Sequence, residues 1–480
     1  MTTRNILGRG KGSRLITIAA VSLFALGFAG VSSAETLADA IGMAYAQNPT
    51  LARARAQQRA NDENYVQARS QLGPDVGFGF DKTYSDHDQG SIFTGGTYRS
   101  TQGLGFSASQ NLFSTGGLSS RVDAAKAGVK SGQADLRSTE QQVLLNVVSV
   151  YTAVRRDQEA LQISQYNYDI LKRQLDQTQA QFEAGQLTRT DVAQSQARLS
   201  ASAAALASAQ AQLDSDRASY VAIVGQAPTA LEPVPDLPGL PTDFNAALDT
   251  AEHNNPDLQA AQFAADSAHA QVTAARSAFG PQVSLSVASN QSGISGRLGS
   301  FEDEQQTTAT LRLSVPLFSS GLNGSRVREA LENETASKAT VEITRRNVVS
   351  TVSQAWSNMI AAKSAVVSNQ EQVKAAQVAA EGVKTEQQVG LRTNIEVLNA
   401  EQEYKGAQLD LVNAQRGQYV AATQLLAVTG NLTPQTFAAN VETYDPAKNF
   451  NRVKNKGWTP LIPVVQTVDA AAARLIAGKK

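Results

Sequence analysis

A heptad repeat of apolar residues, running through one very long stretch, most constrains what this chain can fold into. Every seventh residue from position 147 is apolar or aromatic, and these residues are Val147, Val154, Leu161, Tyr168, Leu175 and Phe182. A heptad of this length keeps one apolar seam of a helix against a partner helix. The stretch from Leu118 to Ala184 is about 67 residues, or roughly 100 Å of helix. The pattern predicts a rod that is too long for one compact core.

The rod occurs twice. After a shift of 205 positions the same seam returns as Val352, Met359, Val366, Val373 and Ala380. The first rod ends at Gly185 and is followed by a polar, alanine-rich helix over Thr190–Val224, and the second rod ends at Gly390. Glycine accepts the left-handed backbone that ends many helices. The sequence therefore predicts two long helical hairpins.

Shorter motifs repeat in the same order, which indicates that the whole unit is duplicated. The repeated pairs are Asn48-Pro49-Thr50-Leu51 with Asn255-Pro256-Asp257-Leu258, Gly73-Pro74 with Gly280-Pro281, and Leu112-Phe113-Ser114-Thr115-Gly116 with Leu317-Phe318-Ser319-Ser320-Gly321. An amphipathic helix is expected from about Leu51, and again from about Leu258. We expect a first repeat over 35–227, a proline-rich linker over 228–242, a second repeat over 243–430 and a C-terminal tail over 431–480.

Between the Gly-Pro motif and the rod, each half alternates apolar and polar residues with a period of two, which predicts strands. The apolar positions are Val76, Phe78 and Phe80, then Leu104, Phe106 and Ala108, and in the second half Val283, Leu285 and Val287, then Ala309, Leu311, Leu313 and Val315. The segments Ser85–Ser100 and Ala288–Thr307 are polar, and we expect loops there. The acidic run Glu302-Asp303-Glu304 fits a solvated loop, with cation or ligand binding as the alternative.

The first 34 residues predict a signal peptide. Four basic residues precede an apolar run over Leu15–Gly30, and Ser32-Ser33-Ala34 provides small residues for cleavage. That apolar run is short for a membrane span. Later in the sequence no apolar run approaches the length of a transmembrane helix.

Composition excludes several classes of function. The chain has no cysteine, so it can form neither disulfides nor thiolate metal sites. The formal net charge is −1, which is not the footprint of a nucleic-acid-binding protein. The three histidines are scattered, and no cofactor or metal site is expected. Asp214 and Asp216 could be read as an acid–base pair, but they lie on a polar helix with no nucleophile motif, so solvated charge is favoured and no enzyme is expected.

Four strands with one apolar face resemble strands of outer-membrane barrels, although a soluble sheet packed on helices is the alternative. Four strands cannot close alone, and lipid tolerates no open sheet edge. If the strands span a membrane, two chains would give 8 strands and three would give 12. A wet lumen favours the larger number, but the residues alone leave both open.

Taken together, these motifs resemble the TolC family of outer-membrane channel tunnels. The resemblance covers nearly all of the chain after the signal peptide, up to about Gly430. Its most specific parts are the two tip motifs, Ala184–Val192 and Val389–Ala400. It implies a trimer with a 12-stranded barrel in the outer membrane, continued by a helical tunnel through the periplasm, and it makes the C-terminal tail over 431–480 periplasmic. It also implies an export duct for type I protein secretion or efflux, opened at its periplasmic mouth by an adaptor and an inner-membrane transporter.

The resemblance implies roles for residues at the tips. Arg392 matches an arginine that ties to a Thr-Asp pair of the neighbouring subunit, here Thr190 and Asp191. Gln387 replaces a tyrosine of that network. Glu396 and Asn399 match two aspartates that ring the constriction, so one acidic ring is lost. The tip residues expected to contact the adaptor are Gly185, Leu187, Thr188, Gly390 and Leu391.

Two alternatives stay open at this point. Thr190, Asp191 and Asn394 are also residue types that cap helices, so the tip motifs could simply begin helices. A periplasmic coiled-coil adaptor without a pore is the alternative function, and it predicts a single hairpin flanked by soluble β domains.

Overall fold

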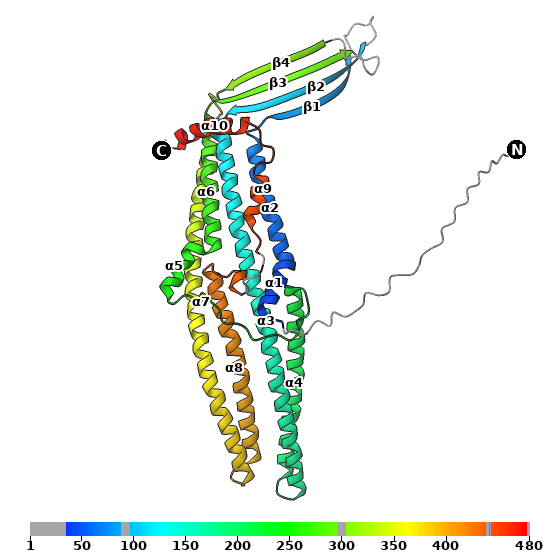
Figure 1. The fold of residues 1–480 in the computed structure, drawn as a ribbon, viewed down its shortest axis with the longest axis vertical. Coiled ribbons are helices and arrows are strands. Elements are labelled where there is room, and N and C mark those ends of the chain that lie inside the picture. Colours follow the sequence, from blue (N-terminus) through cyan, green and yellow to red (C-terminus); the bar gives the residue numbers. More distant parts are fainter. Residues whose placement is uncertain (1–34, 88–96, 295–303, 438–440, 442, 478–480) are drawn as a thin grey trace, which may run out of the picture.

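The computed structural model describes residues 35–87, 97–294, 304–437, 441 and 443–477. The chain is long and narrow, with a four-stranded sheet at one end and two helical hairpins whose tips lie at the other (Figure 1). Among the described residues, no helix contains a stretch both long enough and apolar enough to cross a membrane.

The two predicted rods are confirmed. Helix α3 spans Gly117–Glu183 and α7 spans Leu322–Gln388, with 67 residues each. Each rod turns back into a shorter helix, α4 (Arg189–Val224) or α8 (Asn394–Val428). The turns lie at Gly185 and Gly390, whose φ angles of +74° and +79° favour glycine.

The predicted seam holds the helices together over most of its length. Val147, Val154 and Val352 are fully buried, and Leu175, Val366 and Ala380 are buried as well. Phe182, the last seam position before the tip, is exposed. The largest apolar cluster lies at mid-height, where Tyr151 and Tyr220 pack against the helix that begins at Leu37.

A pair of shorter helices precedes each strand pair, where the sequence predicted one helix. These are α1 (Leu37–Gln47) and α2 (Pro49–Ser70) in the first half, and α5 (Phe244–Asn254) and α6 (Pro256–Arg276) in the second. The expected starts near Leu51 and Leu258 were two residues late. The side chains of Asn48 and Asn255 each accept a hydrogen bond from a backbone N–H of the helix that follows. A proline stands at the first position of each of these helices, where a backbone N–H would have no partner within the helix, so its absence costs nothing.

The same two asparagines show the duplication in three dimensions. The side-chain amide of Asn48 donates to the carbonyl of Ile223 at 3.0 Å. That of Asn255 donates to the carbonyl of Val428 at 2.9 Å. Each asparagine thus ties the start of its helix to the end of the returning hairpin helix in its own half.

The sheet consists of β1 (Asp75–His87), β2 (Thr97–Phe113), β3 (Gln282–Ile294) and β4 (Glu304–Ser314), antiparallel in that order. The strands extend into Ser85–Ser100 and Ala288–Thr307, so the predicted loop bounds were wrong. These segments are polar because an exposed strand does not need apolar residues along its whole length. Glu302 and Asp303 lie outside the described residues.

The strand register collects the predicted apolar positions on one face. Phe78 pairs with Phe106, Ala108 with Val287, and Leu285 with Leu311. Residues paired across antiparallel strands point to the same side, so all four strands contribute to one apolar face. Many of its side chains are exposed, namely Val76, Phe78, Phe80, Phe106, Val287, Leu311 and Leu313. The opposite face carries Gly77, Ser107, Ser286 and Thr310.

The C-terminal segment returns along the outside of the first half. It begins with a 3₁₀ turn (Pro434–Thr436) and forms α9 (Pro446–Val453) and α10 (Leu461–Ala477); a second 3₁₀ turn (Ser277–Phe279) lies between α6 and β3. Helix α9 packs on α2, where Asn449 donates to the Asp62 carboxylate at 2.7 Å. Helix α10 lies across the foot of the sheet (Figure 1).

Candidate functional site

The two hairpin tips lie side by side at the end of the molecule farthest from the sheet, and they hold the residues predicted to form the gate, the constriction and the adaptor contact (Figure 1). Gly185, Thr188, Gly390 and Leu391 are exposed, and Leu187 is half-buried. Leu391 leaves 75% of its surface uncovered, which is high for a leucine in a packed helical protein. The tips are available for contact in the single chain.

Each returning helix begins with a complete capping box, and the two boxes are related by the internal repeat. The Thr188 hydroxyl accepts the Asp191 N–H at 3.3 Å, while the Asp191 carboxylate accepts the Thr188 N–H at 3.0 Å. Thr393 and Glu396 repeat this arrangement, with the Glu396 carboxylate 2.8 Å from the Thr393 N–H. The caps are therefore Thr188 and Thr393, so Thr190 and Asn394 were wrongly considered as capping residues.

Arg392 is held by two carboxylates of its own hairpin. Its Nε donates to Glu386 at 2.7 Å and its Nη1 to Glu396 at 3.0 Å. The Thr393 backbone N–H, the Thr393 hydroxyl and then Arg392 lower the pKa of Glu396 to about 2. Glu396 therefore stays ionised throughout the physiological range, as a residue of an acidic ring would need to be. The link from Arg392 to Thr190 and Asp191 of a neighbouring chain remains a prediction.

Hydrogen bonds to Thr188, first from its hydroxyl and then from its backbone N–H, lower the pKa of Asp191. Thr190 is an exposed residue in the first turn of α4, and Gln387 lies half-buried in the last turn of α7. Asn399 is not isolated, because the guanidinium of Arg198 donates to its Oδ1 at 2.9 Å across the two hairpins. Asn399, the uncharged residue of the predicted constriction, is thus already hydrogen-bonded to the positively charged side chain of Arg198.

A buried polar network behind the tips joins the two hairpins. Gln174 on α3 donates to Asn394 Oδ1 at 2.8 Å, and Asn394 donates in turn to Ser195 on α4 at 3.0 Å. Thr178 lies beside Ser195 and donates to the Gln174 carbonyl at 2.7 Å. All four side chains are buried. The sequence interpretation missed this network, although Gln174 stands directly beside the seam residue Leu175.

A charged cluster at mid-height joins α3 and α4. Arg156 bridges the buried carboxylate of Asp157 and, at 3.2 Å, that of Asp216. Burial and the hydrogen bond with Asp216 raise the pKa of Asp157 to about 6, against the opposing effect of Arg156. Asp216 is therefore not the simply solvated charge that the sequence suggested, whereas Asp214 is exposed. The two carboxylates are paired with Arg156 and have no nucleophile beside them in the described structure, so Asp157 and Asp216 do not form an acid–base centre.

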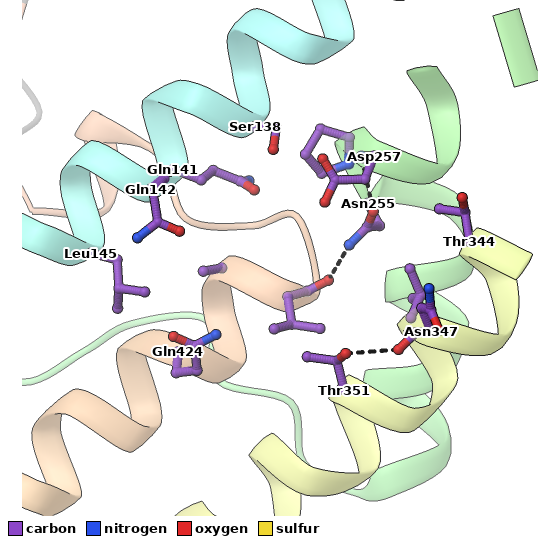
Figure 2. A pocket seen from close by; sticks show the side chains of 14 residues that line it. Ser138, Gln141, Gln142, Leu145, Asn255, Asp257, Thr344, Asn347, Thr351 and Gln424 are labelled. Carbon is purple, nitrogen blue, oxygen red and sulfur yellow. Dashed lines mark hydrogen bonds between the residues drawn. The ribbon is translucent and has the colours of Figure 1, made fainter. Parts of the chain in front are cut away.

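A cavity of about 320 Å³ lies between α3, α6, α7 and α8 (Figure 2). Its labelled side chains are mostly amides and hydroxyls, with Asp257 as the one carboxylate among them (Figure 2). Asn255 points across it to Val428, and Thr351 donates to the carbonyl of Asn347 (Figure 2). In the described part of the chain, no group of three His, Asp or Glu side chains is placed to hold a metal ion. The cavity therefore lies where the hydrogen bond from Asn255 to Val428 ties the start of α6 to the end of α8.

Comparison with known proteins gives one consistent result. Residues 40–226 and 247–431 match the family described as "Outer membrane efflux protein". The chain is 29% identical over 423 residues to the outer membrane efflux protein BepC of Brucella suis, covering 88% of this chain and 91% of BepC. It is 27% identical over 486 residues to the outer membrane protein TolC of Escherichia coli, covering 94% and 96% of the two chains.

The fold agrees with that of a solved channel. The crystal structure of CusC superposes with a TM-score of 0.73 at 18% identity, covering 82% of this chain and 92% of CusC. The family match falls on both halves of the duplication, and each half contains one strand pair and one hairpin. Because it takes in well over half of the sequence, the chain belongs to the family of outer membrane efflux proteins.

Proposed function

We propose that three copies of this outer-membrane export duct close one barrel in the outer membrane and continue it as a helical tunnel through the periplasm. The observation that carries the proposal is a sheet with one exposed apolar face and two open edges, joined directly to 67-residue helices. The duct itself would supply a path and no chemistry, so we propose that it is not an enzyme.

The edges of the sheet explain why one chain is not enough. The order β1-β2-β3-β4 leaves β1 and β4 with a partner on one side only among the described strands. In hydrocarbon each unpaired backbone group costs several kcal/mol, so an open edge is excluded there. Pairing β4 of one copy with β1 of the next removes every edge when the ring closes.

The two faces of the sheet fit lipid on one side and a wet lumen on the other. The exposed apolar side chains include Phe78, Phe106 and Leu311, while Ser107 and Thr310 lie on the reverse. Eight strands leave an interior that side chains can fill, whereas twelve leave room for a passage. The trimer is therefore favoured over the dimer.

We place the gate of this duct at the hairpin tips. Arg392, Thr190, Asp191 and Gln387 would form the links between subunits, and Glu396 and Asn399 would line the constriction. A periplasmic adaptor would bind at Gly185, Leu187, Thr188, Gly390 and Leu391, and an inner-membrane transporter would supply the energy. The exposure of Leu391 and the charged, solvent-facing Arg392 at the same tip support this assignment.

The alternative of a periplasmic adaptor without a pore is wrong. That class was expected to have one hairpin flanked by soluble β domains. The chain has two hairpins and a sheet built from both halves of the duplication. Its family is that of outer membrane efflux proteins, and CusC, a solved structure with the same fold, forms a transmembrane channel.

Single-channel conductance in a planar bilayer, with the mass of the detergent-solubilised protein measured in parallel, tests the proposal. We expect a mass of three chains and a small, steady conductance, because a closed mouth limits ion flow. A dimer would contradict the 12-stranded barrel, and a protein that never inserts would contradict the duct itself.

A further inference from the structure

One face of helix α10 packs against the rest of the protein. Ile462 and Val465 are buried against Leu72, Leu118 and Val122, at the junction between the sheet and the long helices. Ile462 lies against Gly73, two residues before β1 begins. The helix therefore runs along the feet of β1 and β2, crosswise to the long helices (Figure 1).

Asp469 fixes the rotation of α10 about its own axis. This carboxylate is fully buried and accepts the backbone N–H groups of Ser114 at 2.7 Å, Gly116 at 2.9 Å and Ser119 at 3.0 Å. Although burial alone would raise it, these hydrogen bonds lower the pKa of Asp469. The carboxylate also caps the N-terminus of α3, where a negative charge is favourable. The face opposite Asp469 is consequently held away from the protein.

The exposed surface of α10 is apolar along one side. Leu461, Val464 and Val468 follow one another at helical spacing and are 47%, 60% and 51% exposed. Trp458, just before the helix, is 56% exposed. From position 461 to position 473 the one charged residue is Asp469, which is buried. A surface helix that faces water normally carries charges on its outer side.

The surroundings of this apolar stripe match the boundary of a membrane. Ile462, the neighbour of Leu461, lies against Gly73 just before β1, and the exposed side chains of Val76 and Phe78 on β1 begin the apolar face of the sheet. Exposed basic side chains flank it, with Lys456 before the helix and Arg474 in its last turns. Lysine and arginine favour the anionic head groups of phospholipids, and tryptophan is enriched at membrane interfaces.

We propose that α10 is an interfacial anchor, with Trp458, Leu461, Val464 and Val468 embedded among phospholipids of the periplasmic leaflet of the outer membrane. A helix lying in the membrane plane with one apolar face buried is the expected geometry for such an anchor. The proposal rests on the proposed function, since it needs the sheet to span that membrane. It gives the C-terminal segment a role in setting the depth of the barrel in the membrane.

Tryptophan fluorescence in lipid tests this directly, because the chain has two tryptophans, Trp356 and Trp458. The full-length trimer carrying Trp356→Phe is reconstituted into phosphatidylethanolamine–phosphatidylglycerol vesicles with bromine on acyl carbons near the head group. We expect strong quenching of Trp458 by this lipid and weaker quenching by lipid brominated near the chain end. The matched Trp458→Phe trimer, which keeps only the half-buried Trp356 on α7, should be quenched by neither lipid.

Two results would overturn the proposal. Quenching of Trp458 by aqueous iodide but not by bromolipid would place the stripe in water. If neither iodide nor bromolipid quenches Trp458, another protein surface, such as a neighbouring protomer, covers the stripe. Conductance is measured on the same vesicles: trimers that conduct while Trp458 stays unquenched by lipid contradict the anchor alone, and protein that never conducts contradicts the duct as well.

A pair of variants checks the stripe without the fluorophore at its centre. In the Trp356→Phe background, Val464→Asp should remove most of the bromolipid quenching of Trp458, because a carboxylate is expelled from the interface. Val464→Leu should keep it. Equal quenching in both variants would contradict a role of this face in lipid binding.

Discussion

Arg392 makes two ion pairs within its own hairpin, to Glu386 and Glu396, and both are exposed. Such pairs are weak and exchange readily with water and salt. A residue of this kind can leave its own hairpin for a neighbouring chain at little cost, which suits a gate better than a permanent clamp.

We expect Arg392→Ser to raise the conductance of the closed trimer, because the proposed link to Thr190 and Asp191 of the next chain is lost. Single-channel recording checks this, with Arg189→Ser as the control arginine at the other tip. Unchanged conductance in Arg392→Ser, or an equal rise in both variants, would remove Arg392 from the gate.

Asn399 stands where the resemblance implies a second acidic ring, and Arg198 contacts it at 2.9 Å. Asn399→Asp alone should strengthen block of the pore by divalent cations only modestly, because Arg198 would pair with the new carboxylate. Arg198→Gln combined with Asn399→Asp should give the stronger block. The measurement is conductance against Mg²⁺ concentration, and no change in either variant would mean that position 399 does not line the constriction.

Asp157 makes the stability of the joint between α3 and α4 depend on pH. Its pKa is raised from 3.8 to about 6, so the folded chain keeps a proton that the unfolded chain has released. The contribution of this group to the free energy of unfolding therefore falls as pH rises from about 4 to about 6, and the loss is complete above that window. Asp157→Asn abolishes the titration.

We compare the melting temperature of Asp157→Asn with that of the unchanged protein at each pH. The variant should gain more, or lose less, relative to the unchanged protein at pH 7 than at pH 4. Thermal unfolding at the two pH values measures it. Asp214→Asn serves as the control, since Asp214 is exposed and close to the same cluster. A difference that does not vary with pH would show that Asp157 titrates normally.

At the scale of helices, the buried network of Gln174, Thr178, Ser195 and Asn394 couples the two hairpins of one chain close to the tips. Leu187 and Leu391 lie beyond it, so force applied at the tips would reach the hairpins through these hydrogen bonds. A buried polar group without a partner is costly, which makes the joint either fully formed or open.

Asn394→Ala should cost about 1–3 kcal/mol of stability, because it leaves Gln174 and Ser195 buried without their partner. The loosened tips should also raise the conductance of the closed state. Denaturant unfolding and single-channel recording test both effects, and Asn413→Ala, at an exposed position of the same helix, is the control. A stable variant with unchanged conductance would show that the hairpins do not depend on this network.

For the whole molecule, the two faces of the sheet decide whether it can enter a membrane. Val287 and Ser286 are neighbours on β3 that point to opposite faces. An arginine at Val287 would face lipid and cost about 2–4 kcal/mol near the midplane, whereas one at Ser286 would face the lumen. Val287→Arg should therefore lower the yield of membrane-inserted trimer, and Ser286→Arg should keep the yield while changing ion selectivity.

Trimer yield is measured by gel mobility of unheated membrane fractions, and selectivity by reversal potential in a salt gradient. The opposite order, with Ser286→Arg failing to insert, would mean that the assignment of the two faces is reversed.

The sequence by itself determined the duplicated architecture. Heptad seams, Gly-Pro stops and alternation of period two are local patterns, and local backbone preferences and burial decide helix and strand from them. They predicted α3 almost to the residue, the seam and the end of α7, and the glycine turns at Gly185 and Gly390. The sequence did not predict the strand ends or the short helices α1 and α5, because exposed strands and capped junctions between helices need no distinctive apolar pattern.

Only the tertiary structure decided which polar residues meet. The contacts of Asn399 with Arg198 and of Asn394 with Gln174 depend on how two hairpins about 200 positions apart in sequence are laid against each other. The same holds for Asp469, whose role as the cap of α3 comes from a contact with Ser114 over a separation of 355 positions. Side-chain hydrogen bonds of this kind are set by packing in space, and a one-dimensional pattern carries no record of it.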